Sequence, residues 1–65
     1  MDWNKIWDVF RFVCSKEKWM AEIKKNDRNF WRYLPSACRE LKIKLNEDER
    51  TEVYLKICRK LREES

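Results

Sequence analysis

Glycine and histidine are absent from this 65-residue chain, and proline occurs only once. Tight hairpins and turns with positive φ most often use glycine, so its absence argues against β-strands. Histidine is the side chain most often used in general acid–base catalysis, and the Gly-rich loops that bind phosphate groups cannot be built without glycine. The sequence therefore predicts a protein without strands, catalytic residues or cofactors, which is not an enzyme.

Cysteine is sparse as well, and its three positions are far apart in the sequence. Cys14, Cys38 and Cys58 cannot all pair with one another within one chain, because their number is odd. A structural zinc site needs four Cys or His ligands, usually including a closely spaced pair. Each cysteine falls on the apolar stripe of a different expected helix, so we interpret all three as small core residues and predict no metal site.

Long apolar runs are also missing, so we expect no segment that spans a membrane. The first helix could lie on a membrane surface, but residues 1–15 carry no net charge and lack a lysine-rich polar face. Asp8 and Arg11 interrupt the apolar N-terminal stretch, which argues against a secretory signal. These features favour an intracellular location, cytoplasmic or nuclear. The small size is typical of gene products of viruses and mobile elements.

Aromatic and charged residues, by contrast, are both plentiful. Four Trp, three Phe and two Tyr lie in a chain that is 43% charged and carries a net charge of +4. Disordered proteins contain few aromatic residues, so this number of aromatic residues argues against disorder. A chain of this length makes one small helical domain, residues 1–65. Its core alone supplies no more than about 3–5 kcal/mol, so a partner protein or a homodimer would add useful burial.

The spacing of apolar residues predicts an all-α fold, a compact bundle of three to four short helices. We expect these helices at about residues 2–14, 16–25, 28–44 and 47–63. In the first of them, one face carries Trp3, Ile6, Trp7, Phe10, Val13 and Cys14. The phase of the apolar pattern changes after this face, so we expect a break with Ser15 as the N-cap of the second helix. The alternative is one continuous helix with two apolar faces.

Pro35 lies inside the apolar pattern of residues 28–44. Proline removes a backbone donor and disfavours helical angles at the preceding residue, so we expect this segment to be kinked or split there. The favoured form is a short helical turn at 28–33 followed by a helix that begins at Pro35. The last helix has a clearer start, because Asn46 and Glu49 form a variant of the capping box.

Positive charge is concentrated in the middle of the chain. Residues 16–44 carry nine bases and four acids, whereas residues 1–15 are neutral and residues 45–65 carry a net charge of −1. In the middle segment Arg and Lys are interleaved with aromatic residues, as in protein-interface hot spots and in surfaces that bind nucleic acids. The candidate partner-binding residues are Trp19, Lys24, Lys25, Arg28, Trp31, Arg32 and Arg39.

The simplest interpretation of this segment is a solvated basic face with its aromatic residues in the core. A domain of this size, however, cannot easily bury four aromatic residues in addition to its helical stripes. These four are Phe12, Trp19, Trp31 and Tyr33. Our hypothesis is therefore a small non-enzymatic regulatory or inhibitory protein that binds a protein partner stoichiometrically through an aromatic and basic helical surface.

The alternative hypothesis is a regulator that binds DNA or RNA. The segment from Ala37 to Lys44 resembles the first helix and turn of a helix-turn-helix, in which an alanine, a leucine, a turn glycine and an isoleucine follow one another. Lys42 takes the place of the turn glycine. The resemblance implies a recognition helix that begins near Glu47 and Asp48, whose carboxylates would face phosphates and be repelled by them.

Overall fold

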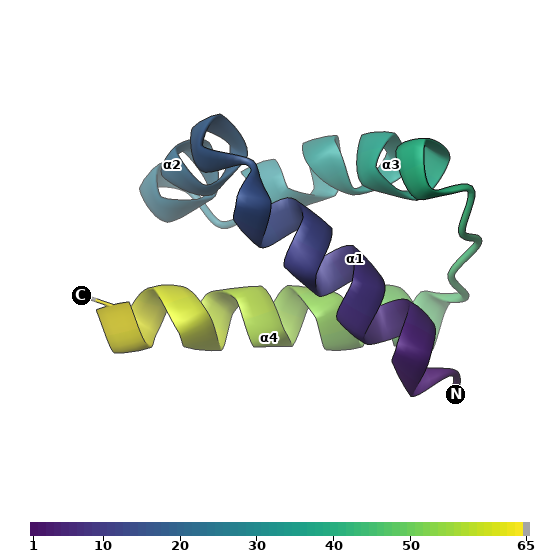
Figure 1. Cartoon of the computed structure of the whole chain (residues 1–65). Coiled ribbons are helices and arrows are strands. Elements are labelled where there is room, and N and C mark those ends of the chain that lie inside the picture. The colour runs from purple at the N-terminus through teal and green to yellow at the C-terminus, as the bar shows by residue number, and fades with distance from the viewer. Residues whose placement is uncertain (65) are drawn as a thin grey trace.

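The computed structural model describes residues 1–64, which form four helices and no strands (Figure 1). The helices are α1 (Trp3–Ser15), α2 (Glu17–Lys25), α3 (Asn29–Leu41) and α4 (Glu47–Glu64). In Figure 1, α3 and α4 run in opposite directions along opposite edges of the molecule, and α1 crosses diagonally between them. The predicted compact all-α bundle is confirmed, and the alternative of one continuous helix through residues 3–25 is not observed.

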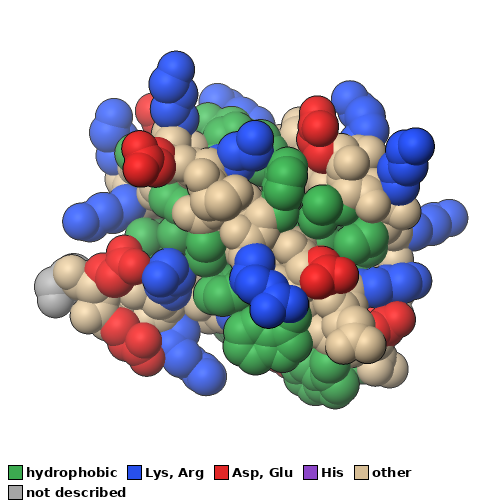
Figure 2. All heavy atoms as spheres, in the orientation of Figure 1, with side chains coloured by type: hydrophobic (Ala, Val, Ile, Leu, Met, Phe, Trp, Pro, Cys, Tyr) green, Lys and Arg blue, Asp and Glu red, His purple; other side chains and the backbone are tan. Residues whose placement is uncertain are grey.

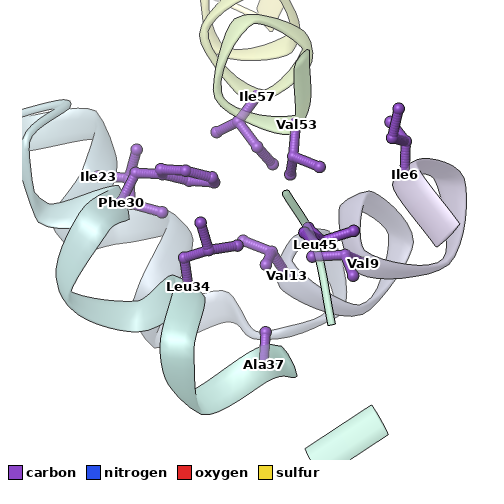
Figure 3. Packing of buried hydrophobic residues seen from close by; sticks show 10 residues of the cluster. All are labelled: Ile6, Val9, Val13, Ile23, Phe30, Leu34, Ala37, Leu45, Val53 and Ile57. Atoms are coloured by element: carbon purple, nitrogen blue, oxygen red, sulfur yellow. The ribbon is translucent and has the colours of Figure 1, made fainter. Parts of the chain in front are cut away.

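Ten buried apolar side chains from all four helices and the α3–α4 connection meet in one core (Figure 3). They are Ile6, Val9, Val13, Ile23, Phe30, Leu34, Ala37, Leu45, Val53 and Ile57. Phe30 is the largest of those that are completely buried. The removal of this apolar surface from water is the main favourable contribution to folding.

The buried face of α1 differs from the predicted one. Ile6, Val9 and Val13 are completely buried, whereas Trp3 and Trp7, which were expected in the core, are 49% and 43% exposed. The reason is that α1 packs against both α3 and α4, so the centre of its contact surface lies along the Ile6–Val13 side of the helix. The two indole rings lie at the border of this surface.

Hydrogen bonds cap the starts of α1 and α4 and join these two helix starts to each other. The Asp2 carboxylate accepts from the backbone N–H groups of Asn4 and Lys5 and caps α1. The predicted capping box of α4 is confirmed: Asn46 Oδ1 accepts from the Glu49 N–H at 2.8 Å, and Glu49 Oε1 accepts from the Asn46 N–H at 2.9 Å. The second Glu49 oxygen accepts from the Asp2 N–H at 2.8 Å, which ties the start of α1 to the start of α4.

The break between α1 and α2 lies where it was predicted, but the expected cap is wrong. Ser15 is the last residue of α1, and its hydroxyl donates to the Phe12 carbonyl at 2.6 Å. Lys16 occupies the N-cap position of α2 without a side-chain hydrogen bond. Its extended backbone, with φ −94° and ψ 91°, changes the direction of the chain. A serine side chain can bond to the preceding turn as readily as to the following one, and here the preceding turn is favoured.

Pro35 does not split α3, so the prediction of a helix beginning at this residue is wrong. The helix is continuous from Asn29 to Leu41. Proline inside a helix costs about 3 kcal/mol, because it removes one hydrogen bond and clashes with the preceding turn. Burial of Phe30 and Leu34 before the proline and of Ala37 after it requires one helical phase throughout, and this packing outweighs the local cost.

Lys42 ends α3 in a left-handed conformation with φ 56° and ψ 40°. Its N–H donates to the Arg39 carbonyl at 3.2 Å, and the next N–H, of Ile43, donates to the Cys38 carbonyl at 2.9 Å. These two bonds define a Schellman motif, which normally has glycine at the left-handed position. Lysine occupies that position here, so the helix ends at residue 41 rather than at the predicted residue 44.

Stability should decline in acid because of Glu49. Hydrogen bonds from the backbone N–H groups of Asn46 and Asp2 hold the pKa of this carboxyl below its ordinary value of 4.5. A depressed folded-state pKa means that the contribution of Glu49 is complete above about pH 5.5 and is lost as the pH falls through the folded-state pKa. Urea unfolding between neutral and acidic pH should therefore show a smaller loss of stability for Glu49→Gln than for the wild type. An equal loss in both proteins would contradict this prediction.

Lys42→Gly should stabilise the fold by about 0.5–1 kcal/mol, because glycine adopts a left-handed conformation without the steric cost that lysine bears. Urea unfolding at neutral pH measures the gain. Lys44→Gly is the matched control: Lys42 is the one non-glycine residue with positive φ among residues 1–64. The control variant should gain no stability.

Candidate binding groove

A groove of about 510 Å³ runs between α3, the connection after it and the first turn of α4. Six of its lining residues are apolar: Trp31, Leu34, Pro35, Cys38, Ile43 and Leu45. The other four are cations: Arg39, Lys42, Lys44 and Arg50. We refer to the first set as the groove floor and to the second as the groove rim.

Helical spacing and the end of α3 together build the groove floor. Trp31, Pro35 and Cys38 follow one another at intervals of four and three residues, so they share one side of α3. The Schellman motif then returns the chain towards this side, because the Ile43 N–H is bonded to the Cys38 carbonyl. Ile43 therefore joins the α3 residues in the groove floor, together with the buried Leu45.

The Trp31 ring is held by contacts with two other aromatic rings and is still partly exposed to solvent. Its ring stacks on Tyr54 of α4, with centroids 5.2 Å apart and planes inclined by 27°. Phe30 meets it edge-on, with centroids 5.0 Å apart. The side chain nevertheless remains 43% exposed. Stacking restricts the ring without covering it, so Trp31 presents a preorganised aromatic surface to the groove.

The groove rim carries four positive charges without a carboxylate among the lining residues. All four cations are exposed, and the ion pairs found among residues 1–64 join other side chains. Within the chain, the rim charges are therefore solvated rather than neutralised. These four cations favour anionic groups on a molecule that approaches the groove.

Cys38 contributes apolar surface to the groove floor rather than a reactive group. Burial raises the pKa of its thiol, and the nearby Arg50 opposes this effect only in part. The thiol therefore stays protonated at neutral pH, and a protonated thiol is a weak nucleophile. In this state Cys38 behaves as a small hydrophobic residue of the groove floor.

The structure distributes the seven predicted partner-binding residues over several surfaces. It brings Trp31 and Arg39 together in the groove. Lys24 and Lys25 line a separate hollow of about 580 Å³ between the end of α2 and the C-terminal part of α4. Arg28 and Arg32, at the start of α3, are exposed and line neither hollow.

Trp19, the seventh residue of that set, lies in an aromatic stack of its own. Its ring is parallel to Tyr33, with centroids 5.1 Å apart and planes inclined by 11°, and meets Phe12 edge-on at 6.0 Å. The Lys16 ammonium lies 4.9 Å from the centroid of Phe12 and 5.9 Å from that of Trp19. Three of the four aromatic residues that were difficult to bury thus cover one another, which leaves Trp31.

Sequence reasoning missed Lys42, Ile43, Lys44 and Arg50 as groove residues. The helix-turn-helix comparison did single out Lys42 as a replacement for a turn glycine, and the structure shows the left-handed backbone that such a glycine would adopt. That signal located the end of α3. It contained nothing about the face to which the following residues return, because this depends on the packing of Leu45 in the core.

A second aromatic surface lies on α1, at the border of the core. The Lys56 ammonium lies 4.4 Å from the centroid of Trp7 and 5.6 Å from that of Trp3, and Phe10 meets Trp7 edge-on. On the face drawn in Figure 2, hydrophobic side chains gather over the N-terminal half of α1. Lysine over aromatic faces is a cation–π arrangement, so this surface has an internal partner for its rings.

Truncation of the two tryptophans should separate their structural roles. Trp19→Ala removes the centre of the Phe12–Tyr33 stack and should cost about 2 kcal/mol, less than the truncation of a fully buried aromatic residue because Trp19 is only partly buried. Trp31→Ala loses one stacked contact and should cost about 1 kcal/mol. Urea unfolding followed by circular dichroism measures both. A larger cost for Trp31→Ala than for Trp19→Ala would contradict this assignment.

Among residues 1–64, no three His, Cys, Asp or Glu side chains lie together in a way that could hold a metal ion, and the cysteines are free. None of the helices described combines the length and hydrophobicity needed to cross a membrane. Comparison with protein families, curated proteins and solved structures finds no match for this chain.

Proposed function

We propose that this chain is a small non-enzymatic protein that regulates or inhibits a protein partner by stoichiometric binding, with the groove as its contact surface. The observation that supports this proposal is the combination of an apolar groove floor, an exposed and stacked Trp31, and a rim of unpaired cations. Trp and Arg are enriched among interface residues whose truncation costs most binding energy.

The dimensions and chemistry of the groove fit the side chains of a protein segment. Its volume of about 510 Å³ lies within the range of sites that bury a compact ligand or a few large side chains. Most of the floor is aliphatic, as in grooves that receive the apolar face of a helix or an extended peptide. The groove lies on elements that are held by the core, so a partner would meet a surface that is already formed.

Binding of DNA or RNA is the second candidate, and the positive rim favours it. Two observations favour a protein partner more. First, α3 and α4 run in opposite directions along opposite edges of the view in Figure 1, whereas the helices of a helix-turn-helix cross at about 90–120°. Second, Glu47 and Asp48 are exposed at the start of α4, where a recognition helix would meet phosphates.

Affinity capture with matched tryptophan variants tests the proposed function. Wild-type protein, Trp31→Ala and Trp3→Ala are compared as baits after nuclease treatment. Trp3 is a suitable control because it is 49% exposed, close to the 43% of Trp31, and lies outside the groove. The wild type and Trp3→Ala should capture the same protein, and Trp31→Ala should bind it at least ~30-fold more weakly, the effect of losing a hot-spot residue worth about 2 kcal/mol.

The stoichiometry of the purified complex completes this test. Its solution mass should correspond to a fixed ratio of the two proteins. The proposed function is wrong if capture disappears after nuclease treatment, or if Trp31→Ala captures the partner as well as the wild type does. Circular dichroism of each variant checks that its helices are retained.

A further inference from the structure

From the groove we infer the chemistry of its occupant: an acidic, amphipathic segment of the partner protein, with bulky apolar side chains on the groove floor and carboxylates along the rim. This inference rests on the proposed function and adds the class of partner. The first argument is charge complementarity. Four exposed cations surround an apolar surface that carries no carboxylate of its own.

The position of Lys42 strengthens this argument. A lysine in the left-handed conformation carries a steric cost that glycine would avoid. At this position the side chain lines the groove, as do the cations Arg39 and Lys44. A glycine would end the helix equally well but would leave the rim without one of its four charges. The residue that is least suited to the backbone is thus one that adds charge to the groove.

The groove floor distinguishes an acidic protein segment from a nucleic acid. Surfaces that bind single strands usually offer aromatic side chains on which successive bases stack. Trp31 is the one aromatic residue of this floor, and the residues beyond it are aliphatic or thiol-bearing. The exposed aliphatic surface of Pro35 and Ile43 suits leucine-like side chains better than it suits bases.

Three synthetic peptides test the inference on the intact protein. The first has leucine residues at i, i+3, i+4 and i+7 with Asp and Glu at the remaining positions. In the second, Lys replaces every Asp and Glu, and in the third, Ser replaces every Leu. Two-dimensional NMR follows the indole N–H of Trp31, which is assigned by its disappearance in Trp31→Ala, together with the backbone N–H groups of Ile43 and Lys44. The first peptide should give saturable shifts at these positions and bind at least ~10-fold more tightly than either control peptide.

Matched charge reversals locate the binding surface. Lys44→Glu should weaken binding of the acidic peptide about 5-fold, whereas Lys18→Glu, which makes the same change of charge on an exposed residue of α2, should leave it within about 2-fold. Lys42→Gly should weaken binding by about 3-fold even though it stabilises the fold. A variant that binds more weakly while its fold is more stable shows that Lys42 acts in recognition and not in folding.

Each of the following outcomes overturns the inference. Equal binding of the acidic and basic peptides would show that the rim does not select charge. Displacement of the acidic peptide by duplex or single-stranded DNA at equal concentration would favour a nucleic acid. A doubled solution mass that Lys44→Glu abolishes would identify a second copy of this chain as the occupant. Failure of the peptides while capture still depends on Trp31 would leave the proposed function standing and remove only the acidic class of partner. Loss of that dependence on Trp31 would remove the proposed function itself.

Discussion

The Glu49 carboxylate is the contact on which the arrangement of α1 and α4 most directly depends. Each of its oxygens accepts one backbone N–H, from Asn46 and from Asp2, so a single side chain caps one helix and anchors the start of another. It is 5% exposed, beside a core that is otherwise apolar. In a domain with so small a core, a buried carboxylate is tolerated because both oxygens have donors.

The groove results from the short connection between α3 and α4. The residues that end α3 and lead into α4 have to return the chain to the core so that Leu45 is buried. The Schellman motif achieves this within two residues, and it leaves Cys38 and Ile43 both lining the groove. The groove is therefore a product of how the connection is made, and its shape depends on the core beneath it.

Periodicity and capping chemistry predicted the fold because both act over a few residues. The capping box of Asn46 and Glu49 is one example. The favoured form of the Pro35 prediction, a helix that begins at this residue, was wrong because burial on both sides of Pro35 overrides the local preference of proline. The site was less predictable. Trp19 and Trp31 each stack on a tyrosine, Tyr33 and Tyr54, and their different exposure depends on tertiary packing that the spacing of apolar residues does not contain.

The hydrogen bonds at the end of α3 also limit how a partner can be recognised. The N–H groups of Lys42 and Ile43 are both bonded to carbonyls of the last helical turn. A partner strand that approached the backbone of Lys42 and Ile43 would find both N–H donors already bonded, which disfavours recognition by strand addition at this point. Selectivity in the groove would come from side chains, so a single substitution on the groove rim would change the preferred partner without disturbing the backbone.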